Sequence, residues 1–279
     1  MRLHDYDTSK RFQAVVKSSE RLTADESDEV REVVLEVDNF PFEVGQLIGV
    51  LVPGPHALGH EQHFRLYTIA NAPGDENRVE ICVKRCSYID DYSGEKYPGI
   101  SSNYLCDLKP GEQVTITGPY GMPFSVPEDK TSDLIMIGLG TGIAPFRAFV
   151  NHIYKTVGGW KGNVRLYHGA RSGLETLYMN DKRDDFTQYY DEETFSAFKA
   201  LSPRPHWHDE VAFHQTLKEH EEEIWSMISH PNTHVYVVGL DVVHKALDDI
   251  FSGMAGSKTQ WERRKAELVA GGRWVELVY

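Results

Sequence analysis

The chain has 279 residues, which is long for one domain and comfortable for two. Apolar residues make up 41% and charged residues 25%, typical of a globular protein, and the longest apolar run, "LIGVLV", is too short to span a bilayer. The net charge of −13 disfavours nucleic acid and anionic membrane surfaces as partners. The three cysteines are too few for a disulfide framework, which suggests a reducing compartment, so we expect a cytoplasmic protein.

Up to about residue 127, the sequence predicts short strands separated by Pro, Gly and Asn clusters. Several strands at this spacing are typical of a small antiparallel β-barrel, so we expect a first domain over residues 1–127. The segment "ISSNYLCDL" differs, because it predicts a helix that Ser101 or Ser102 opens. The expected strands are "FQAVVKSSERL", "EVREVVLEVD", "QLIGVLV", "FRLYTIA", "RVEICVKR" and "EQVTITG".

From about residue 132, apolar strands alternate with helical patterns. This alternation predicts a doubly wound parallel sheet in a second, α/β domain over residues 132–279. The expected strand–helix pairs are "DLIMIGL" with "GIAPFRAFVNHIYKTV", "NVRLYHGA" with "LYMNDKRDDFTQYYDEE", "FSAFKALS" with "VAFHQTLKEHEEEIWSMI", and "HVYVVGL" with "DVVHKALDDIFSGM".

The stretch "RLYTIAN" combines a cation, an aromatic ring and a hydroxyl on one predicted strand. Strand alternation puts Arg65 and Tyr67 on one face and Leu66 and Thr68 on the other. A surface strand with an ordinary salt bridge is the plain alternative to a binding role.

The stretch "GLGTGIAPFR" follows the predicted strand "DLIMI" directly. Its glycines are spaced G-x-G-x-G, which differs from the dinucleotide fingerprint G-x-G-x-x-G. Glycines still allow the backbone close to a phosphate, and free N–H groups at a helix start bind anions. Pro145 suits the first helical turn, where no hydrogen bond is lost. A tight strand-to-helix turn without a ligand is the alternative.

Six motifs occur in order along the chain, and together they are specific although each alone is weak. They are "RLYTIAN", "CVKR" with Tyr88 shortly after, "GISSNYLCDLKPG", "GTGIAPFR", "VYVVGL" and the terminal "WVELVY". From roughly residue 30 to its end, the sequence resembles the plant-type ferredoxin–NADP(+) reductase family. The resemblance implies an FAD-binding barrel followed by an NADP-binding α/β domain.

The resemblance implies a role for each polar residue of "RLYTIAN". In the family, the Arg pairs with the FAD pyrophosphate, the Tyr packs on the isoalloxazine, and the hydroxyl lies near flavin N5. These roles pass to Arg65, Tyr67 and Thr68, and Thr68 is also a catalytic candidate. The other implied FAD contacts are Leu66, Cys82, Val83, Lys84, Tyr88 (which would stack on adenine), Gly99, Ile100, Ser101 and Ser102. For Cys82, a small buried strand residue is an equal alternative.

The carboxyl terminus carries the other catalytic candidates, Glu276 and Tyr279. In the family, the last Tyr stacks on the flavin where nicotinamide must lie, and the ending is Glu-x-Tyr. This chain has one residue more between the two, which on a strand would turn the Glu to the opposite face. Either the carboxylate or the ring is then placed differently, or the last residues are not extended; a docked terminal strand is the plain alternative.

The nicotinamide nucleotide contacts implied by the resemblance lie in the second domain. They are Thr141, Gly142, Pro145, Arg171, Ser202, Arg204, Phe213, Gln215, Gly239 and Leu240. Ser202 and Arg204 resemble the Ser-Arg that grips a 2′-phosphate, although Pro203 separates them, so we expect NADP(H), with NAD(H) possible. Val238 stands where relatives carry Cys. The pair "HWH" (206–208) has no third ligand in view, so we expect no metal.

We therefore expect an FAD-dependent oxidoreductase that moves electrons between NADPH and a separate one-electron carrier such as a ferredoxin or flavodoxin. Those carriers are acidic, so a basic patch is needed, for which Lys84, Arg85 and residues 161–165 are candidates. The first alternative is the reductase component of a multicomponent oxygenase, such as a benzoyl-CoA epoxidase system. The second is a flavin-binding subunit without nicotinamide turnover.

Overall fold

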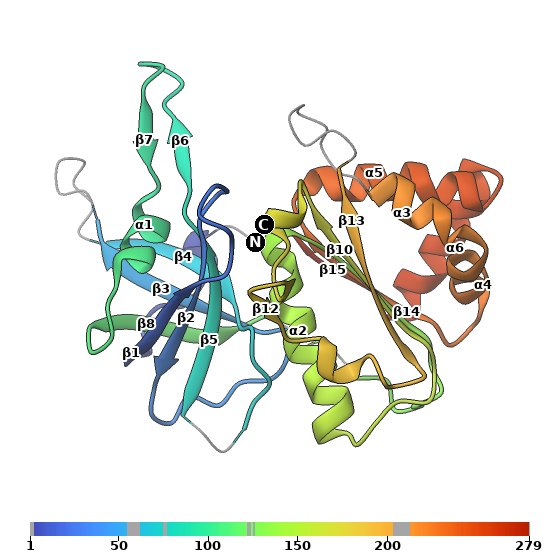
Figure 1. The fold of residues 1–279 in the computed structure, drawn as a ribbon, viewed down its shortest axis with the longest axis horizontal. Coiled ribbons are helices and arrows are strands. Elements are labelled where there is room, and N and C mark those ends of the chain that lie inside the picture. The colour runs from blue at the N-terminus through green and yellow to red at the C-terminus, as the bar shows by residue number, and fades with distance from the viewer. Residues whose placement is uncertain are drawn as a thin grey trace. The chain divides into compact units, whose positions relative to one another are not determined.

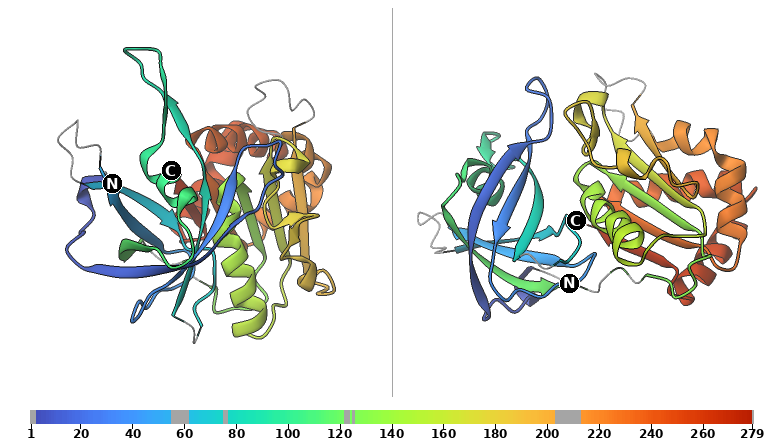
Figure 2. Two further views of the ribbon diagram at one scale, coloured as in Figure 1. Left: turned by 60° about the vertical axis from the view of Figure 1, so that its left-hand side comes forward. Right: turned by 60° about the horizontal axis from the view of Figure 1, so that its bottom comes forward.

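The computed structural model describes residues 3–54, 62–74, 77–121, 124, 126–202 and 213–278 (Figures 1 and 2). The chain divides into two compact units. The first comprises Met1–Phe124 with Arg147–His152, and the second comprises Ser125–Phe146 with Ile153–Tyr279. We call them the barrel unit and the α/β unit.

The barrel unit is built on a six-stranded antiparallel sheet in the order β4-β3-β8-β1-β2-β5. An isolated bridge between Ile69 and Ile81 joins the end of one edge strand to the other, which closes the sheet into a barrel. Alternate Val, Ile and Leu side chains fill its interior, as the predicted strand pattern requires. The strands are β1 (Arg11–Arg21), β2 (Val30–Glu36), β3 (Leu47–Pro53), β4 (Gln62–Thr68), β5 (Arg78–Lys84) and β8 (Gln113–Tyr120).

A hairpin and a helix interrupt the barrel between β5 and β8. The hairpin pairs β6 (Ser87–Ile89) with β7 (Lys96–Pro98), and in Figure 1 it projects from the barrel beside α1 (Ile100–Asp107). Helix α1 begins directly after Gly99, earlier than the predicted start at Ser101 or Ser102. The reason is that the Ser102 hydroxyl accepts the Cys86 N–H (3.2 Å) and does not cap the helix.

The α/β unit contains a five-stranded parallel sheet in the order β13-β10-β9-β14-β15, which confirms the predicted fold class. Buried side chains of this sheet and of helices α3 to α6 form one hydrophobic core. The strands are β9 (Leu134–Leu139), β10 (Val164–Ala170), β13 (Phe195–Leu201), β14 (His234–Gly239) and β15 (Trp274–Val278). The helices are α2 (Ala144–Asn151), α3 (Phe213–Glu219), α4 (Glu221–Ser229), α5 (Asp241–Met254) and α6 (Lys258–Ala270).

One predicted helix, over "LYMNDKRDDFTQYYDEE", is wrong. The segment forms short strands β11 (Met179–Asn180) and β12 (Arg183–Asp184) and a 3-10 helix at Thr187–Tyr189. Asn180 Oδ1 accepts backbone N–H groups of residues 182 and 183, and Asp184 Oδ1 accepts those of residues 186 and 187. Such side-chain bonds offer the backbone an alternative to the helix.

Two further differences concern helices of the α/β unit. A single helix was predicted over "VAFHQTLKEHEEEIWSMI", but the structure has two helices there, α3 and α4. They are separate because His220, which lies between them, has non-helical backbone angles (φ −113°, ψ 19°). Helix α6, which is rich in exposed charged residues, was not predicted. The remaining short helices are Leu3–Asp5, Gly140–Ile143, His152–Thr156 (a π-helix) and Gly173–Glu175. Within the described ranges, no helix has the length and apolarity required to cross a membrane.

Candidate functional site

Strand β4, at the edge of the barrel sheet, carries the residues of "RLYT". Arg65 is exposed, and its guanidinium donates to the Phe64 carbonyl at 2.8 Å. Tyr67 packs against the barrel core, and burial raises the pKa of its phenol, so the hydroxyl stays protonated at neutral pH. Thr68 is half-buried at the strand end. The strand therefore presents one exposed guanidinium and one rigid ring, as the alternation predicts.

The end of β4 is held by a buried ionic network that the sequence analysis missed. Arg147 donates to the Ala70 carbonyl at 3.0 Å and makes a short ion pair with Glu80. Its guanidinium also lies 3.5 Å from the Glu32 carboxylate, and Arg78 pairs with Glu80 at 2.5 Å. Both carboxylates are almost wholly buried, so they require these cations. The network fixes the backbone just after Thr68.

Helix α1 begins at a position suited to an anion. Its N-cap, Gly99, supplies no side-chain hydrogen bond to the first-turn N–H groups. The Ser101 hydroxyl is buried and has no hydrogen-bond partner among the described residues. A buried hydroxyl without a partner beside an uncapped helix start fits a phosphate of a cofactor, because both supply donors to oxygen.

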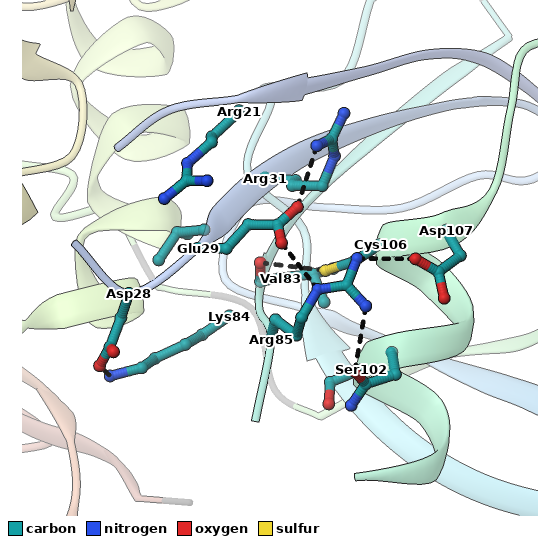
Figure 3. Close-up of polar contacts among 12 residues, drawn as sticks. Arg21, Asp28, Glu29, Arg31, Val83, Lys84, Arg85, Ser102, Cys106 and Asp107 are labelled. Carbon is teal, nitrogen blue, oxygen red and sulfur yellow. Dashed lines mark hydrogen bonds and ion pairs between the residues drawn. The ribbon is translucent and has the colours of Figure 1, made fainter. Parts of the chain in front are cut away.

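Arg85 ties this helix to the barrel, as Figure 3 shows. Its guanidinium donates to Glu29 (2.7 Å) and Asp107 (2.7 Å), which the figure labels. It also donates to Asn103 Oδ1 (3.0 Å). Asn103 in turn donates to the carbonyls of Cys86 (2.9 Å) and Gly99 (2.8 Å). A chain of hydrogen bonds therefore runs from Arg85 to the first turn of α1 and fixes its direction.

The electrostatics of this network favour its charged form. Hydrogen bonds to Asp107 and Glu29 raise the pKa of Arg85. Burial works against ionisation of Glu29, but hydrogen bonds from Arg85 and Arg31 outweigh it and lower the pKa of its carboxyl. Burial raises the pKa of Cys106 to about 12, so its thiol is neutral beside these ions.

The three residues of "CVK" on β5 differ in what they can contact. Val83 lies in the barrel core and Cys82 is buried, so neither side chain reaches the surface. Lys84 is exposed and pairs with Asp28 at 2.8 Å, as Figure 3 shows. Tyr88, on the hairpin, is half exposed. Of these residues, Lys84 and Tyr88 present side chains to a ligand, and the roles of Cys82 and Val83 in binding stay predictions.

In the α/β unit, the glycine-rich turn lies at the carboxyl end of the central strand β9. A Cβ on Gly138 would lie 2.8 Å from the Gly142 carbonyl oxygen, so this crossing requires glycine. Thr141 is half-buried in the turn, and Pro145 is buried in the first turn of α2, as predicted for that position. Ligands of open α/β sheets bind outside the carboxyl ends of the strands, where this turn lies.

The residues predicted to grip the nucleotide beyond this turn are largely engaged with the protein. Arg171, at the end of β10, makes a short ion pair with Glu175. Ser202 is buried after β13. Phe213 is wholly buried, with its ring against Gly169 where a Cβ would stand 2.5 Å away, so it offers no face to adenine in this conformation. Gln215 is exposed. Arg204 and the "HWH" pair lie outside the described residues.

The terminal strand β15 pairs in parallel with β14, so Glu276 lies beside Val237 and faces the helices. Its carboxylate lies 3.2 Å from His244 Nδ1 on α5 and 3.6 Å from Lys265 Nζ on α6, and it accepts a short hydrogen bond from Trp274. Its role as the catalytic carboxylate stays a prediction.

Near that strand end, Gly239 is buried and Leu240 is half exposed. Tyr279 lies outside the described residues. Asn103 was not among the predicted site residues, although an amide four residues after Gly99 is spaced to reach the helix start.

Comparisons with known proteins agree with this architecture. A family model for the oxidoreductase FAD-binding domain matches residues 14–124, and one for the oxidoreductase NAD-binding domain matches residues 136–249.

Two plant relatives share about a third of their aligned residues with the chain. Ferredoxin–NADP reductase, leaf isozyme 1, from rice (Oryza sativa subsp. indica) is 34% identical over 280 residues, 93% of this chain and 74% of the relative. The Arabidopsis thaliana leaf isozyme 1 is 34% identical over 258 residues, 86% of this chain and 68% of the relative.

Solved structures of ferredoxin–NADP+ reductase from Plasmodium falciparum share the fold. One superposes with a TM-score of 0.75 at 18% identity and covers 98% of both chains. Another, with 2′P-AMP, also has a TM-score of 0.75.

Proposed function

The chain belongs to the ferredoxin–NADP reductase family, and from that premise we propose that it passes electrons between NADPH and a separate ferredoxin or flavodoxin. It is an FAD-dependent oxidoreductase with NADP(H) as its nicotinamide substrate. The chemistry that FAD supplies when bound is the exchange of a hydride for single electrons. The observation that carries the proposal is the uncapped start of α1 with its buried Ser101 hydroxyl, beside a barrel strand that bears "RLYT".

Different residues of the barrel unit bind different parts of FAD in this proposal. Arg65 binds the diphosphate, because its planar fork can donate two parallel hydrogen bonds. The first-turn N–H groups of α1 and the Ser101 hydroxyl bind the same group. Tyr67, with its phenol protonated, would pack its flat face on the flavin, and the Thr68 hydroxyl would lie near flavin N5, as the resemblance implies.

The glycine-rich turn of the α/β unit binds the diphosphate of NADP(H) through its backbone. Arg171 is paired with Glu175, and Phe213 is buried. Selectivity for NADP(H) over NAD(H), which lacks the 2′-phosphate, therefore depends on Arg204 and on release of Arg171 from Glu175. In this proposal, Tyr279 would stack on the flavin, as the resemblance implies, and nicotinamide would have to displace it.

Anaerobic mixing of the purified protein with NADPH tests the proposal. We expect a yellow protein whose flavin band bleaches, and a ferredoxin added afterwards is reduced. A colourless protein that cannot take up FAD would contradict the proposal. A yellow protein whose absorbance NADPH does not change would instead support a flavin-binding subunit without nicotinamide turnover.

Replacement of the last residue tests the stacking role separately. Tyr279→Ser opens the nicotinamide slot, so we expect a higher kcat/KM with NADH, with FAD content as the control. Unchanged NADH kinetics would contradict stacking of Tyr279 on the flavin.

One observation favours a second candidate, the reductase component of a multicomponent oxygenase. An acidic ferredoxin requires cations on the reductase, yet Lys84 pairs with Asp28, Arg85 with Glu29 and Asp107, and Arg165 with Glu223. Paired cations attract an acidic carrier weakly. NADPH oxidation that proceeds with an oxygenase component and fails with ferredoxin and flavodoxin would select this candidate.

A further inference from the structure

Two of the aromatic side chains on the β6–β7 hairpin lie against each other outside the described barrel core. Tyr88 and Tyr97 are direct cross-strand partners, so their side chains share one face of the hairpin. They are 50% and 40% exposed, which is unusual for two large rings side by side. Family resemblance assigns Tyr88 to the flavin's adenine, but it assigns nothing to Tyr97.

The two rings form a stack. Their centroids are 5.8 Å apart and their planes differ by 28°. The Tyr97 hydroxyl donates to Glu95 at 2.6 Å, which restrains the ring. Tyr97 therefore stacks on Tyr88, and the half-exposed Tyr88 side chain remains accessible to a third ring.

The hairpin leads directly into the start of α1. Gly99 donates its N–H to the Cys86 carbonyl at 2.9 Å, so the base of the hairpin is bonded to the helix start. Tyr97 precedes Gly99 by two residues, about 7 Å along an extended chain. A dinucleotide whose diphosphate binds at α1 can therefore extend its purine along the hairpin as far as these rings.

The charges beside the rings indicate which molecule covers them. Asp90, Asp91 and Glu95 are close in sequence to the two tyrosines and outnumber Lys96. An acidic electron carrier would be repelled there, whereas an uncharged purine is not, and it gains from stacking on an aromatic face.

We propose that Tyr97 is a positioning residue for the adenine of FAD: it backs Tyr88, so that purine, Tyr88 and Tyr97 stack as three rings. This assignment rests on the proposed function, because it takes FAD as the dinucleotide held at α1. In this assignment, the aromatic ring of Tyr97, and not its hydroxyl, strengthens the binding of FAD.

The test compares FAD with FMN, which lacks the adenosine. The full-length chain is stripped of flavin and titrated with each, following flavin fluorescence. We expect Tyr97→Ala to raise the Kd for FAD about two- to tenfold, the range of an aromatic pair, and to leave the Kd for FMN unchanged. Tyr97→Phe keeps the stack and retains wild-type affinity. Tyr92→Ala, at a fully exposed position of the same hairpin, is the matched control and changes neither Kd.

A double-mutant cycle separates positioning from general support of the hairpin. Because Tyr97 acts through Tyr88, Tyr88→Ala with Tyr97→Ala binds FAD no more weakly than Tyr88→Ala alone. The assignment is overturned if Tyr97→Ala matches Tyr92→Ala, weakens FMN as much as FAD, or still weakens FAD when Tyr88 is Ala. A wild-type chain that binds neither flavin overturns the proposed function itself, and the role of Tyr97 with it.

Discussion

The barrel unit and the α/β unit present their candidate binding groups in opposite ways. In the barrel unit, Arg65, Lys84 and Tyr88 have exposed side chains at strand and hairpin positions. In the α/β unit, Phe213 is packed into the core and Glu276 joins an ionic cluster with the helices. What that unit offers at its sheet edge is chiefly the backbone of the glycine-rich turn.

The difference teaches where each unit is sensitive to substitution. Side chains that bind are only as well placed as the contacts behind them, so the barrel site depends on the ionic networks of Arg85 and Arg147. A site made of backbone depends instead on close packing, such as the approach of Gly138 to the Gly142 carbonyl, and not on the placement of an exposed side chain. The substitutions below test this contrast.

The largest effect is expected from Arg147→Met, which leaves the Glu32 and Glu80 carboxylates buried without this cation. Removing one partner of a buried ion pair destabilises by about 3–5 kcal/mol. Urea unfolding of the flavin-free protein measures the change. Arg263→Met, which removes an exposed pair with Glu267, is the control and changes the free energy of unfolding by less than about 0.5 kcal/mol. Equal effects of the two substitutions would contradict a special role for the network.

A pH-dependent loss of stability is expected in the α/β unit from His168. This side chain is fully buried, its Nε2 accepts the Leu177 N–H at 3.0 Å, and burial lowers its pKa to about 4. Between pH 6.5 and pH 4 the unfolded chain binds a proton that the folded chain does not, so stability falls as pH falls.

The contribution of His168 is about 2 kcal/mol at pH 5 relative to pH 7. His168→Gln keeps an acceptor and removes this titration, so unfolding in urea at the two pH values should differ less in the variant. His4→Gln, at an exposed site, is the control. A variant that loses stability on acidification as steeply as the wild type would rule out His168 as the source.

A smaller effect is expected from Arg85→Lys in the barrel unit. Lysine keeps the charge but cannot bond Glu29, Asn103 and Asp107 in one plane, so the start of α1 is held less firmly. We expect the Kd for FAD to rise about tenfold, which corresponds to about 1.4 kcal/mol. Lys17→Arg, on β1 in an exposed pair with Glu36 of β2, is the reciprocal control. Unchanged FAD affinity would show that α1 does not depend on Arg85.

The smallest effect is expected from Glu276→Gln in the α/β unit. Its carboxylate lies beside His244 and Lys265 and accepts a hydrogen bond from Trp274. Because these contacts occupy it, we expect kcat for NADPH oxidation to change less than about threefold. Glu262→Gln, on the exposed face of α6, is the control. A hundredfold loss of kcat would instead support the predicted role of Glu276 as a catalytic carboxylate.

Patterns local in the chain predicted much of this molecule. The alternation in "RLYT" and the apolar runs of β9 and β14 identified strands correctly, because side-chain period and burial are set within a few residues. The helix predicted over "LYMNDKRDDFTQYYDEE" failed for a reason that is also local: Asn and Asp side chains there bond their own backbone.

Contacts between distant residues were not predictable in the same way. Arg147 meets Glu80, 67 residues away, and Arg85 meets Glu29, 56 residues away. The resemblance placed Phe213 at a nucleotide, yet the structure packs it against Gly169 on a neighbouring strand. Pairings of this kind depend on which distant segments each unit brings together when it folds.

By itself, the sequence determined the barrel and the parallel sheet, the glycine-rich turn after β9, and membership of a flavin- and nicotinamide-dependent family. Only the tertiary structure decided which polar side chains remain available to a ligand. Burial and ion pairing are properties of packed surfaces, so the pairs of Lys84 with Asp28, Glu276 with His244 and Arg85 with Glu29 form only when distant elements meet.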